Sequence, residues 1–279
     1  MMTDGDVSAL GHADAHRESV AAQTAIIELL RAQSAVPPRS RVARVFGMSP
    51  LSHETHALYR GVVGEIEVGE ALDRLGPEWA VRHALPVEAG LGDIDHLVIG
   101  PAGVFIVATK NYSGLNVWAS QRTLMVAGVR QPHIRNMEFE MGSAERILSA
   151  AAGGVVEVSG ILAVVAAKNL VVREKHRDVA VLSASHLVAW LQRHKRVLSP
   201  EQAAHIGAAA SSAATWSSEH TADDRPQLVR EQFEALRAEV SRAWRVQLTW
   251  AIGTTVVGVG SFAGITYAIL MNAIGSFGF

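Results

Sequence analysis

The residues best placed to do chemistry lie in one predicted β-hairpin, residues 93–114, with the sequence DIDHLVIGPAGVFIVATKNYSG. If the GPAG turn at 100–103 is symmetric, Asp95 lies opposite Ala108, and cross-strand partners share a face of the sheet. Lys110 comes two residues after Ala108, so its side chain returns to that face. The spacing therefore predicts a carboxylate and an ammonium side by side; the plainer alternative is two polar strand ends.

A carboxylate beside a lysine suits phosphoryl chemistry. Carboxylate oxygens bind hard divalent cations, and a nearby lysine can orient a water or stabilise the charge that develops on a phosphate. The predicted helix upstream, GVVGEIEVGEALDRL at 61–75, offers another carboxylate. Glu65 precedes Val68 and Leu72 by three and seven residues, which places it near the buried stripe of that helix. A carboxylate on the core side is unusual unless something there needs it.

These segments together resemble a known family. The series GVVGE, VGEALDRL and GDIDHLVIGPAGVFIVATKNYSG is similar to the nuclease-related domain, NERD, over about residues 58–195. Such domains resemble the restriction-endonuclease-like superfamily with its PD-(D/E)XK-like site, which has an Asp on one strand, Glu-x-Lys on the next and a helical Glu. The resemblance implies that Glu65, Asp95 and Lys110 are catalytic. It also implies that Glu65 and Asp95 hold Mg²⁺ or Mn²⁺ and that the substrate is a nucleic acid.

The chain departs from the family pattern at two places. Ala108 stands where the family has Glu, so that ATK replaces ETK and a presumed metal ligand is missing. The family often shows Asn-Pro-x-x-Gln later in the domain, where this chain has QPHIRN at 131–136. Glu138 or Glu140 from the following helix could compensate for the missing carboxylate, and the sequence does not choose between them. Two readings stay open: a metal-dependent phosphodiesterase of reduced activity, or a catalytically inactive module, tethered to a membrane, that binds nucleic acid or protein.

The bulk composition limits the chemistry without naming it. The chain has 279 residues with a formal net charge of −2, so no global positive field indicates nucleic-acid binding, although a local basic groove remains compatible with that charge. It has no cysteine, which excludes disulfides, thiolate zinc sites and thiol nucleophiles. His53 and His56 could share a helix face and bind a metal, but capping or surface roles fit them better, because Ser52 is placed as an N-cap.

The C-terminus predicts a membrane anchor. No Asp, Glu, Lys, Arg or His occurs from Val246 to Phe279, and the stretch from Trp250 to Met271 would form a helix roughly 33 Å long. Arginines precede this stretch and no basic residue follows it. The positive-inside bias then predicts a single-pass membrane protein whose large N-terminal part is cytoplasmic.

The elements that must position the site alternate loosely between strand and helix. Strands are predicted at about 79–85, 93–99, 103–110, 122–127, 160–167 and 178–182, and helices at 13–34, 53–75, 133–151, 184–195, 199–215 and 227–247. This order predicts an α/β fold with a mixed central sheet flanked by helices, followed by a C-terminal transmembrane helix.

The expected organisation has four parts. They are a helical and basic N-terminal extension at 1–52, a NERD-like domain at 53–215, a linker with a charged amphipathic helix at 216–247, and a transmembrane anchor at 248–274. The helices at 13–34 and 227–247 could also drive self-association.

Overall fold

The computed structural model describes residues 21–87, 93–174, 176–212, 215–216 and 226–275, with side chains in the last helix described to Thr255. The described residues divide into two compact units. The first contains residues up to Leu29 together with Ala57–Arg230, and the second contains Leu30–His56 together with the residues from Glu231 onward.

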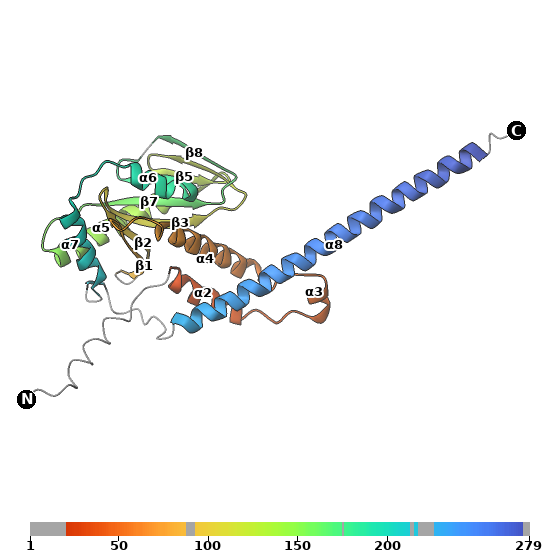
Figure 1. The fold of residues 1–279 in the computed structure, drawn as a ribbon, viewed down its shortest axis with the longest axis horizontal. Coiled ribbons are helices and arrows are strands. Elements are labelled where there is room, and N and C mark those ends of the chain that lie inside the picture. Colours follow the sequence, from red (N-terminus) through yellow and green to blue (C-terminus); the bar gives the residue numbers. More distant parts are fainter. Residues whose placement is uncertain (1–20, 88–92, 175, 213–214, 217–225, 276–279) are drawn as a thin grey trace, which may run out of the picture. The chain divides into compact units, whose positions relative to one another are not determined.

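A five-stranded mixed sheet forms the centre of the first unit (Figure 1). Its strand order is β1-β2-β3-β7-β9, with antiparallel pairing from β1 to β3 and parallel pairing from β3 to β9. The strands are β1 (Ala80–Pro86), β2 (Asp93–Gly100), β3 (Gly103–Asn111), β7 (Val158–Val165) and β9 (Val179–Ser183). The mixed α/β fold predicted for this part of the chain is confirmed. The run of apolar residues predicted as a doubly buried strand is β7, between β3 and β9.

A second, four-stranded sheet was not predicted as a separate sheet. Its order is β6-β5-β4-β8. The strands are β4 (Asn116–Ser120), β5 (Thr123–Val126), β6 (Val129–Gln131) and β8 (Asn169–Glu174). β4 and β8 pair in parallel, and the other neighbours are antiparallel, so the chain leaves the central sheet after β3 and again after β7 to build this one.

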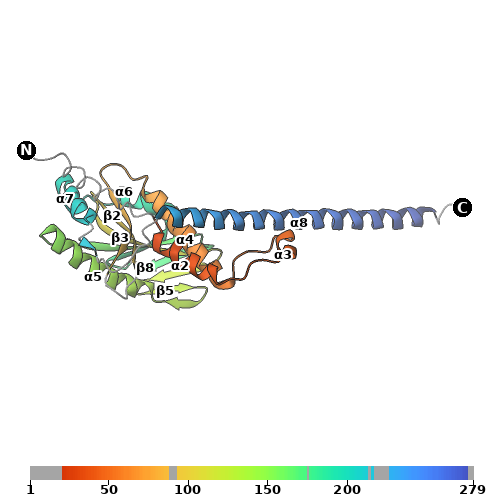
Figure 2. The same ribbon diagram turned by 90° about the horizontal axis from the view of Figure 1, so that it is seen from below.

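Helices cover both faces of the central sheet (Figure 2). The helices of this part of the chain are α2 (Gln23–Ser34), α4 (His53–Leu72), α5 (His133–Ala152), α6 (Leu187–Arg193), preceded by the short turn η1 (Ala184–His186), and α7 (Pro200–Ser211). α5 packs on the face that carries Val104, Ile106 and Ala108, whereas residues of α4 and α6 pack with Phe105 and Val107 on the other face.

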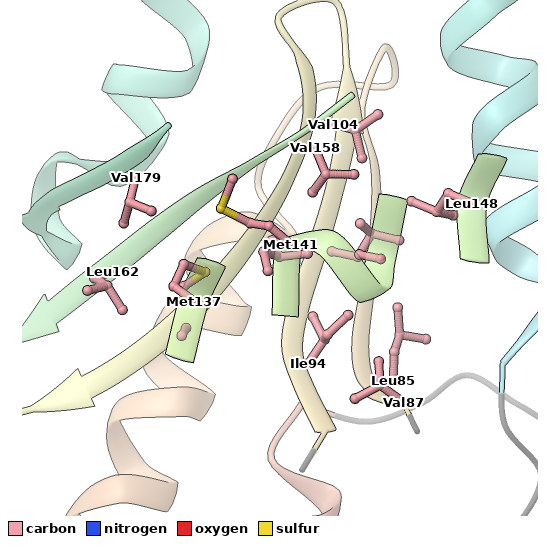
Figure 3. Close-up of a cluster of buried hydrophobic side chains, with 14 of the residues drawn as sticks. Leu85, Val87, Ile94, Val104, Met137, Met141, Leu148, Val158, Leu162 and Val179 are labelled. Carbon is pink, nitrogen blue, oxygen red and sulfur yellow. The ribbon is translucent and has the colours of Figure 1, made fainter. Parts of the chain in front are cut away.

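The core under α5 fixes the position of that helix (Figure 3). Met137 and Met141 point toward the strands that carry Val104, Val158 and Leu162. A side chain at Gly160 would place its Cβ 2.5 Å from Met137 Cγ, so only glycine lets α5 approach β7 this closely. The register of α5 on the sheet is therefore set by close packing.

The second unit contains α3 (Arg41–Val45) and most of α8 (Pro226–Gly275), a single continuous helix of 50 residues. Trp250 Nε1 donates to the Val45 carbonyl at 2.7 Å, and the Phe46 and Trp250 rings lie 5.3 Å apart. Arg39 pairs with Glu239 at 2.5 Å. The helix predicted at 227–247 lies inside α8; much of the linker predicted before it and residues 13–20 of the first predicted helix lie outside the described residues.

The structure contradicts the predicted membrane anchor. No helix in the part of the chain that the structure describes is long and apolar enough to cross a membrane. This finding overturns the transmembrane helix expected at 248–274 and, with it, the single-pass membrane location. The segment belongs to α8. Arg245 lies just before it, and its described residues include Gly253, Thr254 and Thr255. Glycine and threonine contribute little hydrophobicity, and three of these residues stand in succession at 253–255.

Candidate active site

Asp95 occupies the point where β2 and β3 separate. The observed register pairs Ile99 with Val104 and His96 with Val107, which confirms the predicted hairpin turn and places Asp95 beside Ala108. The backbone pairing of β2 with β3 ends at His96 and Val107. Just past that point, the Asp95 Oδ2 atom accepts a hydrogen bond from the Thr109 backbone N–H at 2.7 Å. The carboxylate is thus locked in place by the neighbouring strand.

The electrostatics of Asp95 reflect a crowded, partly buried site. Burial raises the pKa of Asp95, while the Lys110 ammonium and the Thr109 N–H act in the opposite direction and Asp93 adds repulsion. Lys110 lies near the end of β3 on the same face as Asp95, as the spacing predicted. The structure therefore brings the predicted carboxylate and ammonium together.

Glu65 approaches from α4. Burial, followed by repulsion from Asp95, raises the pKa of Glu65 to about 9, although Lys110 and a hydrogen bond from the Ala22 backbone N–H oppose the rise. The helix is tied to the end of β3 by Asn111, whose Nδ2 donates to the Arg60 carbonyl at 2.9 Å, five residues before Glu65. All three predicted site residues thus interact through their charges.

A further carboxylate comes from α5. Burial, with repulsion from Asp95, raises the pKa of Glu140 to about 7, and Lys110 acts against that rise. Glu138 instead accepts from His176 Nε2 at 3.1 Å, away from this group. Of the two acids that could replace the missing family Glu, Glu140 is therefore the one that faces the site. The sequence did not separate the two acids, because each stands three and four residues from positions that are buried: Met137 and Ala144 for Glu140, Ile134 and Met141 for Glu138.

The acidic side chains near Lys110 are of the type that binds a hard cation, but the distances between them are not those of a metal site. Three acids, Glu65, Asp95 and Glu140, share one neighbourhood with Lys110 as a countercharge. Yet no group of three His, Cys, Asp or Glu among the described residues is close enough to hold a metal ion. Charge is felt over longer distances than a metal–oxygen bond spans, so both observations hold if the acids lie slightly beyond ligand distance. The described residues therefore supply acidic oxygen donors of the kind that hard cations bind, without three of them at ligand distance.

A buried histidine pair supports Asp95 from the other side and was not predicted. His83 Nδ1 lies 2.8 Å from His96 Nδ1, and His83 Nε2 lies 3.0 Å from Asp73 Oδ1. Thr109 Oγ1 is 3.4 Å from His96 Nε2. Burial, with the charge of His83, lowers the pKa of His96 well below its ordinary value. Thr109 therefore connects a neutral, buried histidine to the backbone group that holds Asp95; the adjacency of Asp95 and His96 in the sequence was the only signal.

The start of α2 closes over the acidic residues. Ala22 is fully buried and donates its N–H to Glu65, and Thr24 Oγ1 donates to Asp93 Oδ2 at 2.5 Å. His53 and His56, by contrast, are exposed, and Ser52 Oγ accepts from the Thr55 N–H at 3.1 Å as the N-cap reading predicted. A metal site at those histidines is not seen among the described residues.

Comparison with known proteins agrees with this geometry. The family model of the nuclease-related domain, NERD, matches residues 60–162, which contain Glu65, Asp95, Lys110 and Glu140. Residues 60–162 are therefore similar to a nuclease-related domain. This confirms the resemblance drawn from the sequence, and a restriction-endonuclease-like superfamily is consistent with it.

One curated protein matches a short part of the chain. The chain is 43% identical over 60 residues to a Bacillus anthracis protein named "Uncharacterized protein pXO1-01/BXA0003/GBAA_pXO1_0003". The alignment covers 20% of this chain and 28% of that protein. No solved structure matches the chain. The comparisons thus give a likeness to a nuclease-related domain, and they support neither a membrane partner nor self-association.

Proposed function

We propose that the NERD domain of this chain is a metal-dependent phosphodiesterase acting on nucleic acid, with Glu65, Asp95, Glu140 and Lys110 as its active-site residues. The observation that supports it most is the convergence of three acids on one lysine, within the residues that match the family. The domain is proposed to extend over 53–215, beyond the matched segment.

Each residue has a distinct task in this proposal. Glu65, Asp95 and Glu140 would hold Mg²⁺ or Mn²⁺, and such an ion lowers the pKa of bound water and polarises a phosphoryl oxygen. Lys110 stabilises the negative charge of the pentacoordinate phosphate, which is worth most in a partly buried site. Thr109 fixes Asp95 through its backbone N–H, so that this carboxylate does not have to be ordered when the substrate binds.

The direct test is cleavage of labelled DNA and RNA by the full chain with Mg²⁺ or Mn²⁺. Lys110→Ala is expected to lower the cleavage rate by about 10²- to 10³-fold, the typical cost of removing one stabilising group. Lys168→Ala is the matched control, because Lys168 is an exposed lysine of the same domain. No cleavage by the parent, or equal cleavage rates for the two variants, would contradict the proposal that this domain is a phosphodiesterase.

The second candidate is a module that binds nucleic acid or protein through the same residues without catalysis. Ala108 in place of the family Glu, and the lack of three acids at ligand distance among the described residues, favour it. It predicts that the chain binds nucleic acid in EDTA and leaves it intact with every divalent metal tried. Cleavage that disappears in Lys110→Ala would exclude this reading.

A further inference from the structure

A second charged feature lies beside the candidate active site and takes no part in it. A pocket of about 460 Å³ is lined by Arg122, Arg130, Gln131, Pro132 and Arg135. Arginine therefore supplies three of the five lining residues. We refer to this feature as the arginine pocket.

Three different elements bring these arginines together. Arg122 lies in the turn between β4 and β5, Arg130 lies on β6, and Arg135 lies in the first turn of α5. β6 pairs with β5 so that Gln131 faces Leu124, which places the end of β6 next to the turn that carries Arg122. α5 begins immediately after Pro132, so its first turn completes the wall.

The positive charges in the pocket are not neutralised by neighbouring acids. Arg122, Arg130 and Arg135 are all exposed, and none forms an ion pair with a described carboxylate at 4.0 Å or less. The Arg135 guanidinium lies over the Phe139 ring, 5.8 Å from its centroid. Glu174 lies across from Ser120 at the end of β4, but its carboxylate accepts a hydrogen bond from the Ser120 hydroxyl at 3.1 Å and forms no ion pair with these arginines. Three like charges without an internal partner favour an external anion.

The geometry of arginine favours phosphate among anions. A guanidinium presents a planar set of donors that matches two phosphate oxygens at once, which is why arginine dominates sites that recognise phosphate. Gln131 adds an amide donor at the rim. Pro132 is the N-cap of α5 and caps it with no side-chain hydrogen bond, so the positive end of the helix adds to the field of the arginines.

The arginine pocket adjoins the Lys110 end of the active site. His133 directly follows Pro132, and its ring lies 6.3 Å from the Tyr112 ring, two residues after Lys110. Burial, together with the charge of Lys110, lowers the pKa of His133 to about 4. His133 is thus a neutral spacer between Lys110 and the arginine pocket.

We propose that the arginine pocket binds a backbone phosphate of the nucleic-acid strand, next to the phosphate that Lys110 contacts. This inference rests on the proposed function, because it treats the two phosphates as belonging to one strand. Arginine contacts to phosphates carry no base information. The pocket therefore gives affinity and position without sequence preference.

The test is a binding titration of the full chain with labelled single-stranded and duplex DNA in EDTA. Fluorescence anisotropy measures the binding constant at several salt concentrations. Arg122→Gln/Arg130→Gln/Arg135→Gln is expected to reduce the slope of log K against log [salt] by about two to three for duplex, since each phosphate contact contributes about 0.9. Arg74→Gln/Arg193→Gln/Lys195→Gln is the matched control: it removes the same charge from exposed residues outside the pocket. The control should change the slope by less than about one.

A lysine version separates charge from geometry. Arg122→Lys/Arg130→Lys/Arg135→Lys should keep the salt slope and lose affinity, because lysine retains the charge without the bidentate fork. Equal slopes for the glutamine variant and its control would overturn the proposal. Binding of inorganic phosphate to the parent that is lost in the glutamine variant, without any effect of that variant on DNA affinity or salt slope, would also overturn it, in favour of a free-phosphate site. Because no metal is present, failure of catalysis with Mn²⁺ would leave this result intact and the two failures remain distinct.

Discussion

At the scale of single residues, the site concentrates acidic groups whose charged forms are disfavoured by burial and by mutual repulsion. Glu65 and Glu140 have raised pKa values, about 9 and about 7, and both result first from burial and then from Asp95. Lys110 is the countercharge shared by both and by Asp95. Such groups are costly for stability and are typical of places where a ligand supplies the missing charge.

The raised pKa of Glu65 makes a signed prediction about stability. Its ordinary value is 4.5, so between about pH 4.5 and 9 the folded state binds more protons than the unfolded state. The stability that protonated Glu65 contributes is complete below pH 4.5 and is lost as the pH rises through about 9. Glu65→Gln removes this loss and should raise the free energy of unfolding at pH 8 by at least about 1.4 kcal/mol, the equivalent of one pKa unit.

Urea denaturation in EDTA at pH 4.5 and pH 8 measures this effect. The advantage of Glu65→Gln should vanish at pH 4.5, and Glu67→Gln, on the exposed side of α4, should behave like the parent at both values. A destabilised Glu65→Gln at pH 8 would contradict the electrostatic picture of the site.

At the scale of elements, α5 supplies what β3 lacks. Ala108 is buried in the core beneath α5, in the position where the family carries its second strand carboxylate, and Glu140 of α5 comes to the same neighbourhood. This predicts that the carboxylate can be moved between the two elements. Glu140→Ala should weaken Mn²⁺ binding by at least about tenfold, and Ala108→Glu/Glu140→Ala should recover most of that loss.

Isothermal titration calorimetry with Mn²⁺ would follow the exchange. Ala108→Glu alone places a fourth acid in the site and should bind Mn²⁺ more tightly than the parent, because hard cations depend on ligand charge. A double variant no better than Glu140→Ala would show that β3 and α5 do not serve one ion.

The elements also show what the sequence could and could not reveal. The hairpin register followed from the turn at 100–103, and the helix expected at 133–151 is α5 at His133–Ala152. β8 was missed because its residues are mostly exposed, which leaves no buried periodic pattern to read. β4 alternates between buried and exposed over only five residues, too few to stand out. The second sheet, and with it one wall of the arginine pocket, therefore became visible only in the structure.

At the scale of the whole molecule, the proposed chemistry belongs to one of the two units. Glu65, Asp95, Lys110, Glu140 and the arginine pocket all lie between Ala57 and Arg230. The expectation of a membrane-anchored protein came from reading the uncharged C-terminus as apolar, and the absence of a membrane-spanning helix among the described residues corrected it. The site expectations did not depend on that reading, because the hairpin and α4 set them locally.

Mn²⁺-dependent cleavage of labelled nucleic acid by the parent chain, Glu140→Gln and Glu138→Gln shows whether Glu140 belongs to an active site. The two variants remove the same charge from the same helix, two residues apart, and only Glu140 interacts with Asp95 and Lys110. We expect the parent and Glu138→Gln to cleave alike, while Glu140→Gln is slower by about 10²-fold or more. Equal cleavage by both variants, or none by the parent, would contradict it.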